Sequence, residues 1–407
     1  MENPKIRFKG FTKDWEQRKL GDMGSTYTGL SGKTKEDFGH GDAKFITYMN
    51  VFSNPVANLD MTESVEIDSK QNCVKAGDVF FTTSSETPEE VGMSSVMPEN
   101  ADNIYLNSFC FGYRPTEKFD LNYLAYVLRT ESFRKEMTFL AQGISRYNIS
   151  KNKVMEVEIP IPSLDEQSRV GQYFKNLDTL ITLHQRKCEQ TKNLKKYMLQ
   201  KMFPQNGAKV PEIRFNGFTH DWEQRKLIDY LEVSSEKNRD NRFTKEDVLS
   251  VSGEYGIVNQ IEFQGRSFAG ASVSNYGVVE NGDVVYTKSP LKSNPYGIIK
   301  TNKGIPGIVS TLYAVYKPKE ITDSKFVQIY FELDSRMNSY MHPLVNKGAK
   351  NDMKVSAENA LKGMVSFPKK DEQEMISLYF STIDHLITLH QRQTDFYKKP
   401  NFYFISS

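Results

Sequence analysis

Two blocks of sequence occur twice in this 407-residue chain, in the same order. Residues 4–20 (PKIRFKGFTKDWEQRKL) match residues 211–227 (PEIRFNGFTHDWEQRKL) at 14 of 17 positions. Residues 165–186 recur as residues 371–392, and both copies end in LITLHQR. The pairs are offset by 207 and 206 residues (211 − 4 and 371 − 165), whereas most of the sequence between them has diverged. The chain is therefore a duplicated half-molecule in which a shared framework carries two dissimilar inserts.

Length and composition favour a soluble protein of two to three domains. The chain is 38% hydrophobic and 26% charged, as globular proteins are. It has no apolar run of roughly 18 residues and no apolar core of a signal peptide at its start, so we expect a cytoplasmic protein. Three widely spaced cysteines fit a reducing compartment. The net charge of +2 does not by itself predict nucleic-acid binding.

Each half is predicted to contain a framework block, a variable α+β segment and a long helix. The framework blocks hold the only tryptophans, Trp15 and Trp222, which we expect to be buried anchors. Aromatic and β-branched runs predict strands near Lys44, Asp78, Ile104, Asp283 and Gly307, and helical spacing predicts helices from Leu121 and Lys325. The expected boundaries are 1–160 and 206–366 for the globular domains, and 161–205 and 367–407 for the helices.

An apolar seam runs along each long helix, with steps alternating between four and three residues. Its members are Val170, Phe174, Leu177, Ile181 and His184 in the first helix, and Ile376, Phe380, Ile383, Ile387 and His390 in the second. Such a stripe needs a partner helix, and a first helix from Glu166 to Met202 would be roughly 55 Å long. We therefore predict an α+β fold, with two pseudo-symmetric globular α/β-type domains separated by a long antiparallel two-helix coiled coil.

The helix ends carry their own signals. Ser163 and Glu166 form a predicted capping box at the start of the first helix. Asp371 is the expected cap of the second helix. Pro400 should end the second helix early, and the aromatic tail after it has no counterpart in the first half. The second helix is therefore expected to be the shorter one.

The sequence lacks a recognisable catalytic motif. Residues 32–34 (Gly-Lys-Thr) resemble the end of a phosphate-binding loop, but Tyr27 stands where that motif needs glycine. Residues 294–296 (Asn-Pro-Tyr) resemble part of an adenine-methyltransferase box, yet no glycine-rich cofactor loop precedes them. His184 and His390 have no partner at metal-ligand spacing. These observations favour a binding or scaffolding protein.

This layout resembles the specificity (S) subunits of bacterial type I restriction–modification systems. The resemblance covers essentially the whole chain. It is carried by the Pro4-x-Ile-Arg-Phe-x-Gly-Phe…Trp15-Glu-Gln-Arg-Lys-Leu block, the Lys75-Ala-Gly-Asp-Val-Phe-Phe strand, Gly143…Asn148-Ile-Ser, Ile159-Pro-Ile-Pro…Asp165-Glu-Gln, and the repetition of the set.

The resemblance implies a chain that is not an enzyme by itself. Each variable segment would be a target-recognition domain that reads one half of a bipartite double-stranded DNA target, and the dissimilar segments imply an asymmetric target. The helices would set the spacing and dock two methyltransferase (M) subunits, through which restriction (R) subunits join. S-adenosylmethionine, ATP and Mg²⁺ would belong to those partners, with no cofactor or metal in this chain.

Two polar loops in each half are the predicted DNA-contacting segments, because amides, guanidinium groups and hydroxyls read base edges while lysines contact phosphates. In the first half they contain Thr82, Thr83, Ser84 and Ser85, then Ser145, Arg146, Tyr147 and Asn148. In the second half they contain Lys288, Ser289 and Lys292, then Lys350, Asn351 and Lys354. Any single one of these residues could equally be an ordinary polar loop residue.

Two other functions stay open at this point. An autonomous enzyme acting on nucleic acid would need an acidic or metal-binding cluster in one variable segment. A duplicated protein-docking scaffold would use the same helices without contacting DNA. Turnover by the purified chain would favour the first, and a DNA-binding assay with a methyltransferase partner would test the second.

Overall fold

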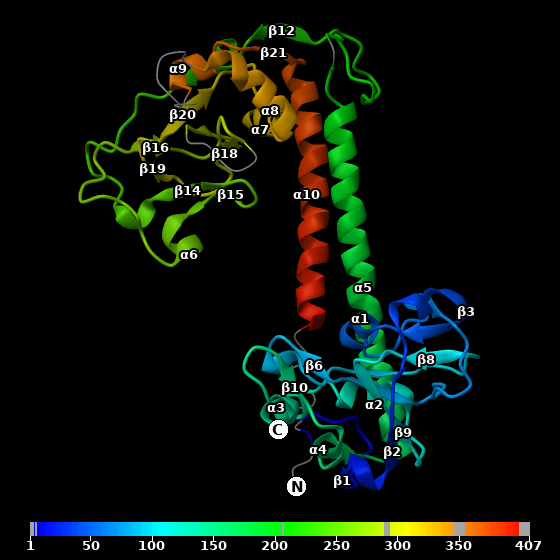
Figure 1. Ribbon diagram of the computed structural model, residues 1–407. Helices are drawn as coiled ribbons and strands as arrows, with labels where there is room; N and C mark the ends of the chain where they lie inside the picture. The colour runs from blue at the N-terminus through cyan, green and yellow to red at the C-terminus, as the bar shows by residue number, and fades with distance from the viewer. Residues whose placement is uncertain (1–3, 5, 206, 289–293, 346–354, 399–407) are drawn as a thin grey trace. The chain divides into compact units, whose positions relative to one another are not determined.

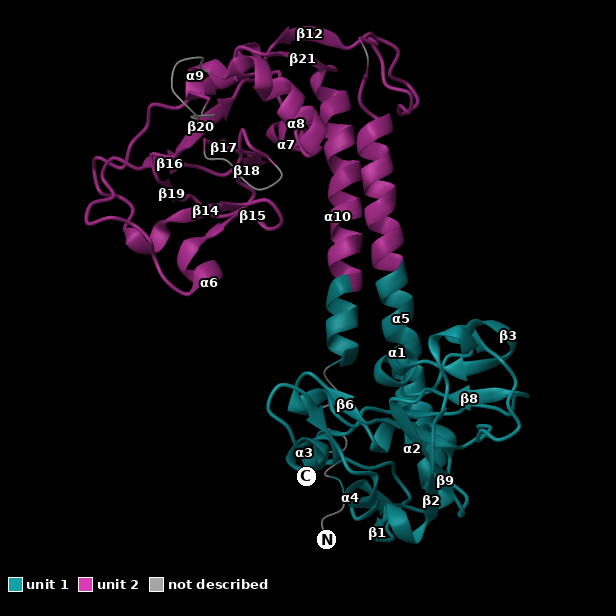
Figure 2. Cartoon of the chain, in the orientation of Figure 1, with its two compact units in different colours: residues 1–186, 391–407 teal, residues 187–390 magenta. Residues whose placement is uncertain are grey.

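The computed structural model describes the whole chain except residues 1–3, 5, 206, 289–293, 346–354 and 399–407 (Figure 1). The chain divides into two compact units, residues 1–186 with 391–407 and residues 187–390 (Figure 2). Helix α5 (Leu164–Lys201) crosses from unit 1 to unit 2 after Arg186, and helix α10 (Lys370–Lys398) crosses back after His390. This division differs from the four expected segments, because part of each long helix packs into a globular core.

Unit 1 is built on sheets in which all but one of the described strand pairs are antiparallel. Its framework strand β1 (Glu16–Lys19) pairs with β11 (Glu158–Ile161), which directly precedes α5. The main sheet has the order β2-β9-β5-β7, and a second sheet has the order β4-β3-β8, in which β3 and β8 are parallel. The strands are β2 (Gly24–Thr28), β3 (Phe38–Ile46), β4 (Thr62–Val65), β5 (Val79–Thr82), β6 (Ser84–Ser85), β7 (Ser94–Val96), β8 (Ile104–Leu106), β9 (Cys110–Pro115) and β10 (Tyr147–Asn148). The helices are α1 (Tyr48–Ser53), α2 (Leu121–Val127), α3 (Glu131–Leu140) and α4 (Lys151–Met155), with 3-10 turns at Leu20–Asp22, Lys35–Asp37 and Pro88–Glu90.

Unit 2 repeats this plan. Its framework strand β12 (Glu223–Lys226) pairs antiparallel with β21 (Met364–Phe367), directly before α10. The main sheet has the order β13-β20-β17-β18, beside the pairs β14–β15 and β16–β19. The strands are β13 (Leu231–Val233), β14 (Leu249–Ser252), β15 (Gly256–Asn259), β16 (Gly277–Val279), β17 (Val284–Thr287), β18 (Ile299–Thr301), β19 (Gly307–Val309) and β20 (Tyr313–Pro318). The helices are α6 (Gln260–Gln264), α7 (Ser324–Tyr330), α8 (Asp334–Met341) and α9 (Ala357–Ala360), with 3-10 turns at Leu227–Asp229, Lys245–Asp247 and His342–Leu344.

The helix predicted from Leu121 forms as two helices. Thr130 accepts a hydrogen bond from the Phe133 N–H and so begins α3 after α2 has ended at Val127. The strand predicted from Ile104 is likewise two strands, because the Asn107 side chain accepts from the Phe109 N–H and turns the chain. In unit 2 the helix predicted from Lys325 is divided into α7 and α8.

Both tryptophans are buried anchors, as predicted. Trp15 meets the Tyr123 ring edge-on at 6.2 Å between centroids. Trp222 meets Phe326 in the same manner at 5.9 Å. Since the residues occupy matching places in the two units, the duplicated framework is a duplicated packing arrangement.

The predicted capping box at the start of α5 is half correct. The Ser163 hydroxyl accepts from the Glu166 N–H at 3.4 Å, but the Glu166 carboxylate binds the Arg7 guanidinium through both oxygens, at 2.6 and 2.8 Å. At the start of α10 the Lys369 carbonyl accepts the first helical N–H bonds, and Asp371 lies inside the first turn. The prediction that Asp371 caps α10 is therefore wrong.

The long helices pair antiparallel within unit 2. Cys188 Sγ lies 4.0 Å from the Ile387 carbonyl oxygen, and Lys195 Nζ lies 2.6 Å from Asp384 Oδ1, so rising numbers in α5 meet falling numbers in α10. In unit 1 the end of α10 is held where the Tyr397 ring stacks on His184 at 5.7 Å. The fold class is confirmed as mixed helix and sheet with a helix pair.

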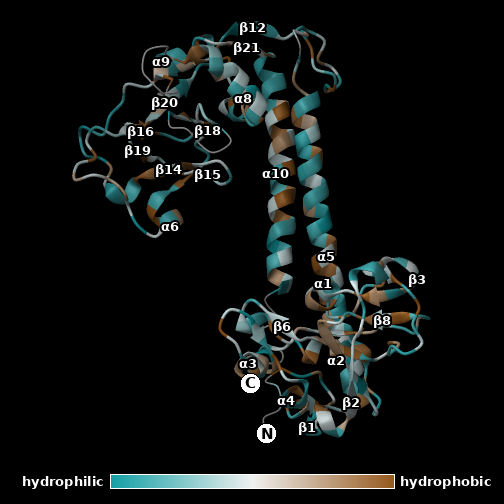
Figure 3. Ribbon diagram, in the orientation of Figure 1, coloured by the Kyte–Doolittle hydropathy of each residue, from teal (hydrophilic) through white to brown (hydrophobic). Residues whose placement is uncertain are grey.

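The seam residues also enter the globular cores. Val170, Phe174 and Leu177 belong to the core of unit 1, and Ile376, Phe380 and Ile383 belong to that of unit 2. Ile181 is buried, whereas His184, Ile387 and His390 are half-buried. Figure 3 shows apolar and polar bands alternating along α10. Helix α10 has 29 described residues against 38 in α5, and Pro400, at which we predicted its end, lies outside the described residues. Among the described helices, none is both long and apolar enough to cross a membrane.

Candidate nucleic-acid interface

The two predicted DNA-contacting segments of unit 1 lie against each other. Strand β6 pairs antiparallel with β10, which places Ser84 opposite Asn148 and Ser85 opposite Tyr147. The Ile149 N–H donates to the Thr83 carbonyl at 3.0 Å. We call residues 142–148 the recognition hairpin. Sequence reasoning selected both segments without indicating that they pair.

Three of the selected hydroxyl residues lie beneath this surface. Thr82 is fully buried, and its oxygen accepts from the Met93 N–H at 3.0 Å. Ser84 and Ser85 are also buried, and the Ser85 hydroxyl donates to the Glu90 carboxylate at 3.2 Å. The prediction of direct DNA contact is corrected for Thr82, Ser84 and Ser85, because buried hydroxyls with internal partners can only support the surface.

The exposed part of the hairpin contains Arg146, Ser145 and Asn148, for which DNA contact stays a prediction. Arg146 is exposed, and its Nε and Nη2 both donate to Ser84 Oγ, at 3.2 and 3.0 Å. Its guanidinium carbon lies 6.0 Å from the centroid of the Phe109 ring. A guanidinium group fixed in this way is preorganised for a base edge or a phosphate. Ser145 and Asn148 are exposed beside it.

Two aromatic residues of this surface were missed by the sequence reasoning. Thr83, which is half-buried, donates its hydroxyl to the Phe109 carbonyl at 2.8 Å. The Tyr48 hydroxyl donates to the Ser84 carbonyl at 2.7 Å, and burial raises the pKa of Tyr48. Tyr147 is half-buried in β10. Phe109 and Tyr48 therefore hold the segment Thr83–Ser84, and Ser84 orients Arg146. In the sequence, the only signal for Phe109 is its position next to the strand ends.

In unit 2 the structure describes one of the six selected residues. Lys288 is half-buried at the end of β17, and its ammonium group donates to the Thr311 carbonyl at 2.7 Å. Burial, together with the charge of Lys237, lowers the pKa of Lys288. The other five lie outside the described residues: Ser289, Lys292, Lys350, Asn351 and Lys354.

The repeated Gly-Asp strand motif has a structural role. Asp78 accepts from the Lys75 N–H at 2.8 Å and pairs with Arg114 at 2.7 and 2.6 Å. In unit 2, Asp283 accepts from the Glu280 N–H at 2.8 Å and pairs with Lys317 at 2.8 Å. The carboxylate thus closes the turn before the central strand, and the loop that follows this strand starts from the same framework in both units.

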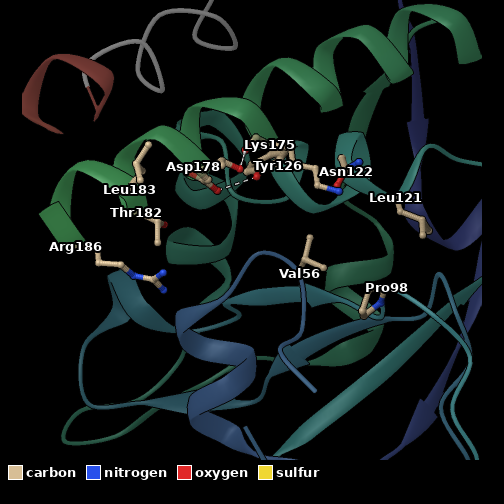
Figure 4. Close-up of a pocket in the computed structure, with 11 residues that line it drawn as sticks. Val56, Pro98, Leu121, Asn122, Tyr126, Lys175, Asp178, Thr182, Leu183 and Arg186 are labelled. Carbon is tan, nitrogen blue, oxygen red and sulfur yellow. Dashed lines mark hydrogen bonds between the residues drawn. The ribbon is translucent and has the colours of Figure 1, made fainter. Parts of the chain in front are cut away.

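A cleft of about 560 Å³ lies between α5 and the globular part of unit 1 (Figure 4). The Tyr126 hydroxyl donates to the Asp178 carboxylate at 2.8 Å inside it, and burial raises the pKa of Asp178, opposed by that hydrogen bond and by Arg129. Lys175 and Arg186 also line the cleft. In unit 2 the matching carboxylate, Asp384, pairs instead with Lys195.

The long helices also expose a repeated apolar patch. Leu183 in unit 1 and Leu389 in unit 2 occupy matching places in the LITLHQR repeat, and both are exposed. Leu386, one helical turn before Leu389, is exposed as well, and its counterpart Leu180 is half-buried. These leucines lie outside the buried seam. We call them the leucine patches, one in each unit.

The comparisons with known proteins agree with this architecture. The family model described as the type I restriction modification DNA specificity domain matches residues 12–193. The putative type I restriction enzyme MjaX specificity subunit of Methanocaldococcus jannaschii is 23% identical and covers 94% of this chain and 89% of its own length. The MjaVIII specificity subunit of the same organism is 32% identical over 21% of this chain and 20% of its own length.

A solved structure shares the fold over its full length. The S subunit of the type I restriction–modification system from M. genitalium covers 100% of both chains with a TM-score of 0.59 at 14% identity. The duplicated framework, the paired long helices and the family match at the first half point to one conclusion. The chain resembles type I restriction–modification specificity subunits over nearly its whole length, and its residues 12–193 match the DNA specificity domain of that family.

Proposed function

We propose that the chain reads a bipartite, asymmetric target in double-stranded DNA and directs methyltransferase subunits to it in the cytoplasm. Restriction subunits would join the complex through the methyltransferases. The observation that carries this proposal is the recognition hairpin, where Arg146 is held in place by Ser84 with Ser145 and Asn148 exposed beside it. A rigid cluster of one guanidinium, one amide and one hydroxyl group suits base-edge recognition.

The asymmetry of the target is supported by the difference between the inserts. The Gly-Asp carboxylate closes the turn before its strand in both units, but the residues at the end of that strand are hydroxyls in unit 1 and include Lys288 in unit 2. The buried Ser84 hydroxyl holds the Arg146 guanidinium in unit 1, whereas unit 2 has the Lys288 ammonium group, and these two cations differ in the base edges and phosphates that they can contact. The two halves of the target should therefore differ in sequence.

Docking of two methyltransferase subunits is supported by the leucine patches. A pair of matching apolar patches on matching helix positions fits two copies of one partner, whereas a single partner would need only one patch. The binding of S-adenosylmethionine, ATP and Mg²⁺ is assigned by this proposal to the partner subunits. The chain itself would supply the choice of sequence.

The proposal is tested by expressing the chain with its methyltransferase partner and mapping methylated adenines genome-wide. A split, non-palindromic motif is expected. Arg146→Ala should then weaken binding of that motif by roughly 1–3 kcal/mol and relax one position in one half. The matched control is Arg18→Ala, because Arg18 forms an exposed ion pair with Glu117 in the framework. A palindromic motif, or equal effects of the two variants, would contradict the proposal.

A protein-docking scaffold without DNA binding is the second candidate, and the leucine patches favour it equally. The two functions differ in a gel-shift assay with the methyltransferase added. A scaffold would bind the partner and leave DNA unshifted, whereas the proposed specificity subunit would shift duplexes that contain the mapped motif.

A further inference from the structure

Ile144 is the most exposed large apolar side chain among the described residues, at 96% exposure. It lies at the tip of the recognition hairpin, between Gly143 and Ser145. Single exposed apolar residues are common on protein surfaces. The way in which this residue is held therefore matters more than its exposure.

The hairpin holds Ile144 on a rigid support. Gln142 and Asn148 exchange both backbone hydrogen bonds, at 2.9 and 2.8 Å. Gly143 has a φ of 153°, and a Cβ atom there would lie 2.0 Å from the Arg146 carbonyl oxygen. A larger residue would open this turn, so the chain reverses tightly around Ile144.

The base of the hairpin is anchored in the core of unit 1. Ile149, the residue after β10, is 7% exposed and packs in that core. Its N–H donates to the Thr83 carbonyl at 3.0 Å, which ties the hairpin to the segment after β5. These contacts hold both ends of the loop that carries Ile144.

The surroundings of Ile144 are polar and include positive charge. Arg146 is two residues away and is held by Ser84, and Lys151 and Lys153 are exposed on α4, directly after the hairpin. Glu90 is an acidic group on the paired segment, where it accepts from Ser85. An exposed apolar tip beside a guanidinium and two ammonium groups fits DNA, where phosphates surround stacked apolar bases, better than an apolar protein surface.

We propose that Ile144 inserts between two adjacent base pairs of the half-target read by unit 1 and unstacks them. This inference rests on the proposed function. Proteins that kink DNA use Ile, Leu, Phe, Met or Pro in this way, and opening one step costs a few kcal/mol. A wedge needs a rigid support to meet that cost, and the hairpin provides one.

The wedge adds sequence preference at a step that no polar group reads. Pyrimidine–purine steps such as TA and CA/TG unstack more easily than others. Unit 1 should therefore favour such a step at the insertion point. Arg146, oriented by Ser84 and Phe109, contacts the DNA beside the opened step.

The test uses the full chain with its methyltransferase and duplexes of the mapped target, each with 2-aminopurine at one position of the half read by unit 1. Binding should raise the fluorescence at one step, because the probe loses its stacking. Ile144→Ala should abolish this rise and weaken binding about 5-fold or more. The matched control is Ile67→Ala, since Ile67 is an exposed isoleucine of unit 1 outside the hairpin, at 54% exposure. Both variants should melt like the parent, because both side chains are exposed.

The proposal is overturned if a specific complex forms with no rise at any position, or if the rise persists in Ile144→Ala. Uracil in place of thymine provides a further check. If uracil weakens binding of the parent but not of Ile144→Ala, the residue contacts a thymine methyl group and does not insert. If no sequence-specific complex forms at all, the proposed function itself fails and the wedge fails with it.

Discussion

The two units make the same framework bond in different settings. In unit 1 the Arg7 guanidinium binds Glu166 at the start of α5, and in unit 2 Arg214 binds Glu372 at the start of α10 through two bonds of 2.7 Å. Both carboxylates are almost fully buried. The duplication has therefore kept the bond that fixes each framework block to its helix.

The partner of a carboxylate shared by the two long helices differs between the units. Asp178 in unit 1 accepts from the neutral Tyr126 phenol, whereas Asp384 at the matching place in unit 2 pairs with the Lys195 ammonium group. The framework therefore keeps this carboxylate while its partner changes, from a tyrosine of the insert in unit 1 to a lysine of α5 in unit 2.

The aromatic core of unit 2 should respond most strongly to substitution. Phe203, just after α5, packs between Trp222 and Phe326 at 6.0 and 5.8 Å, and is 1% exposed. Phe203→Ala should lower the free energy of unfolding of unit 2 by about 4 kcal/mol. In a chain with Trp15→Phe, denaturant unfolding followed by Trp222 fluorescence measures this change. Phe139→Ala is the control at an exposed phenylalanine, and a comparable loss in both variants would contradict the assignment.

The shared framework bond offers a direct test of equivalence. Arg7→Ala and Arg214→Ala each leave a buried carboxylate without its cation, and each should cost about 3 kcal/mol of unfolding free energy. Trp15 fluorescence reports on the first variant and Trp222 fluorescence on the second, in backgrounds that lack the other tryptophan. Costs that differ severalfold would show that the two framework bonds are not equivalent.

A smaller effect is expected at Lys195, whose ion pairs distinguish unit 2 from unit 1. Lys195 pairs with both Glu332 and Asp384, and its side chain is 13% exposed. Lys195→Met should cost about 2 kcal/mol in unit 2, because two charged partners lose a hydrogen bond. Chemical denaturation monitored by Trp222 measures the loss. The control variant is Lys196→Met, because Lys196 is an exposed neighbour. An equal loss of unfolding free energy in both variants would show that the Lys195 ion pairs do not stabilise unit 2.

The smallest expected effect concerns Asp178. Burial raises the pKa of this carboxyl, so the folded state favours its neutral form. Its stabilising contribution is present below the unfolded pKa of about 3.9 and is lost as the pH rises through the raised folded pKa. Asp178→Asn should flatten the stability profile across that window and stay within about 1 kcal/mol of the parent at neutral pH. A variant that is much less stable at neutral pH would show that the Asp178 carboxylate is needed.

The features that could be predicted from the sequence are those that occur in both halves of the chain. The doubled tryptophans, the doubled helices and the Gly-Asp strands follow from matching blocks, and the structure places each in a core or a framework. Long-range bonds were out of reach: Glu166 meets Arg7 across the framework, and Ser84 meets Asn148 across a pairing that no periodicity indicates. Thr82 was selected although it is buried, because a strand covered on both faces has no alternating pattern.

Each unit is proposed to read its own half of the DNA target, and exchanging one insert separates the two readings. Residues 24–157 are replaced by the corresponding segment of another family member, and methylated adenines are mapped in cells that also hold the methyltransferase. The account predicts a new sequence in one half of the target, with the other half and the spacer unchanged. A change in both halves would contradict it.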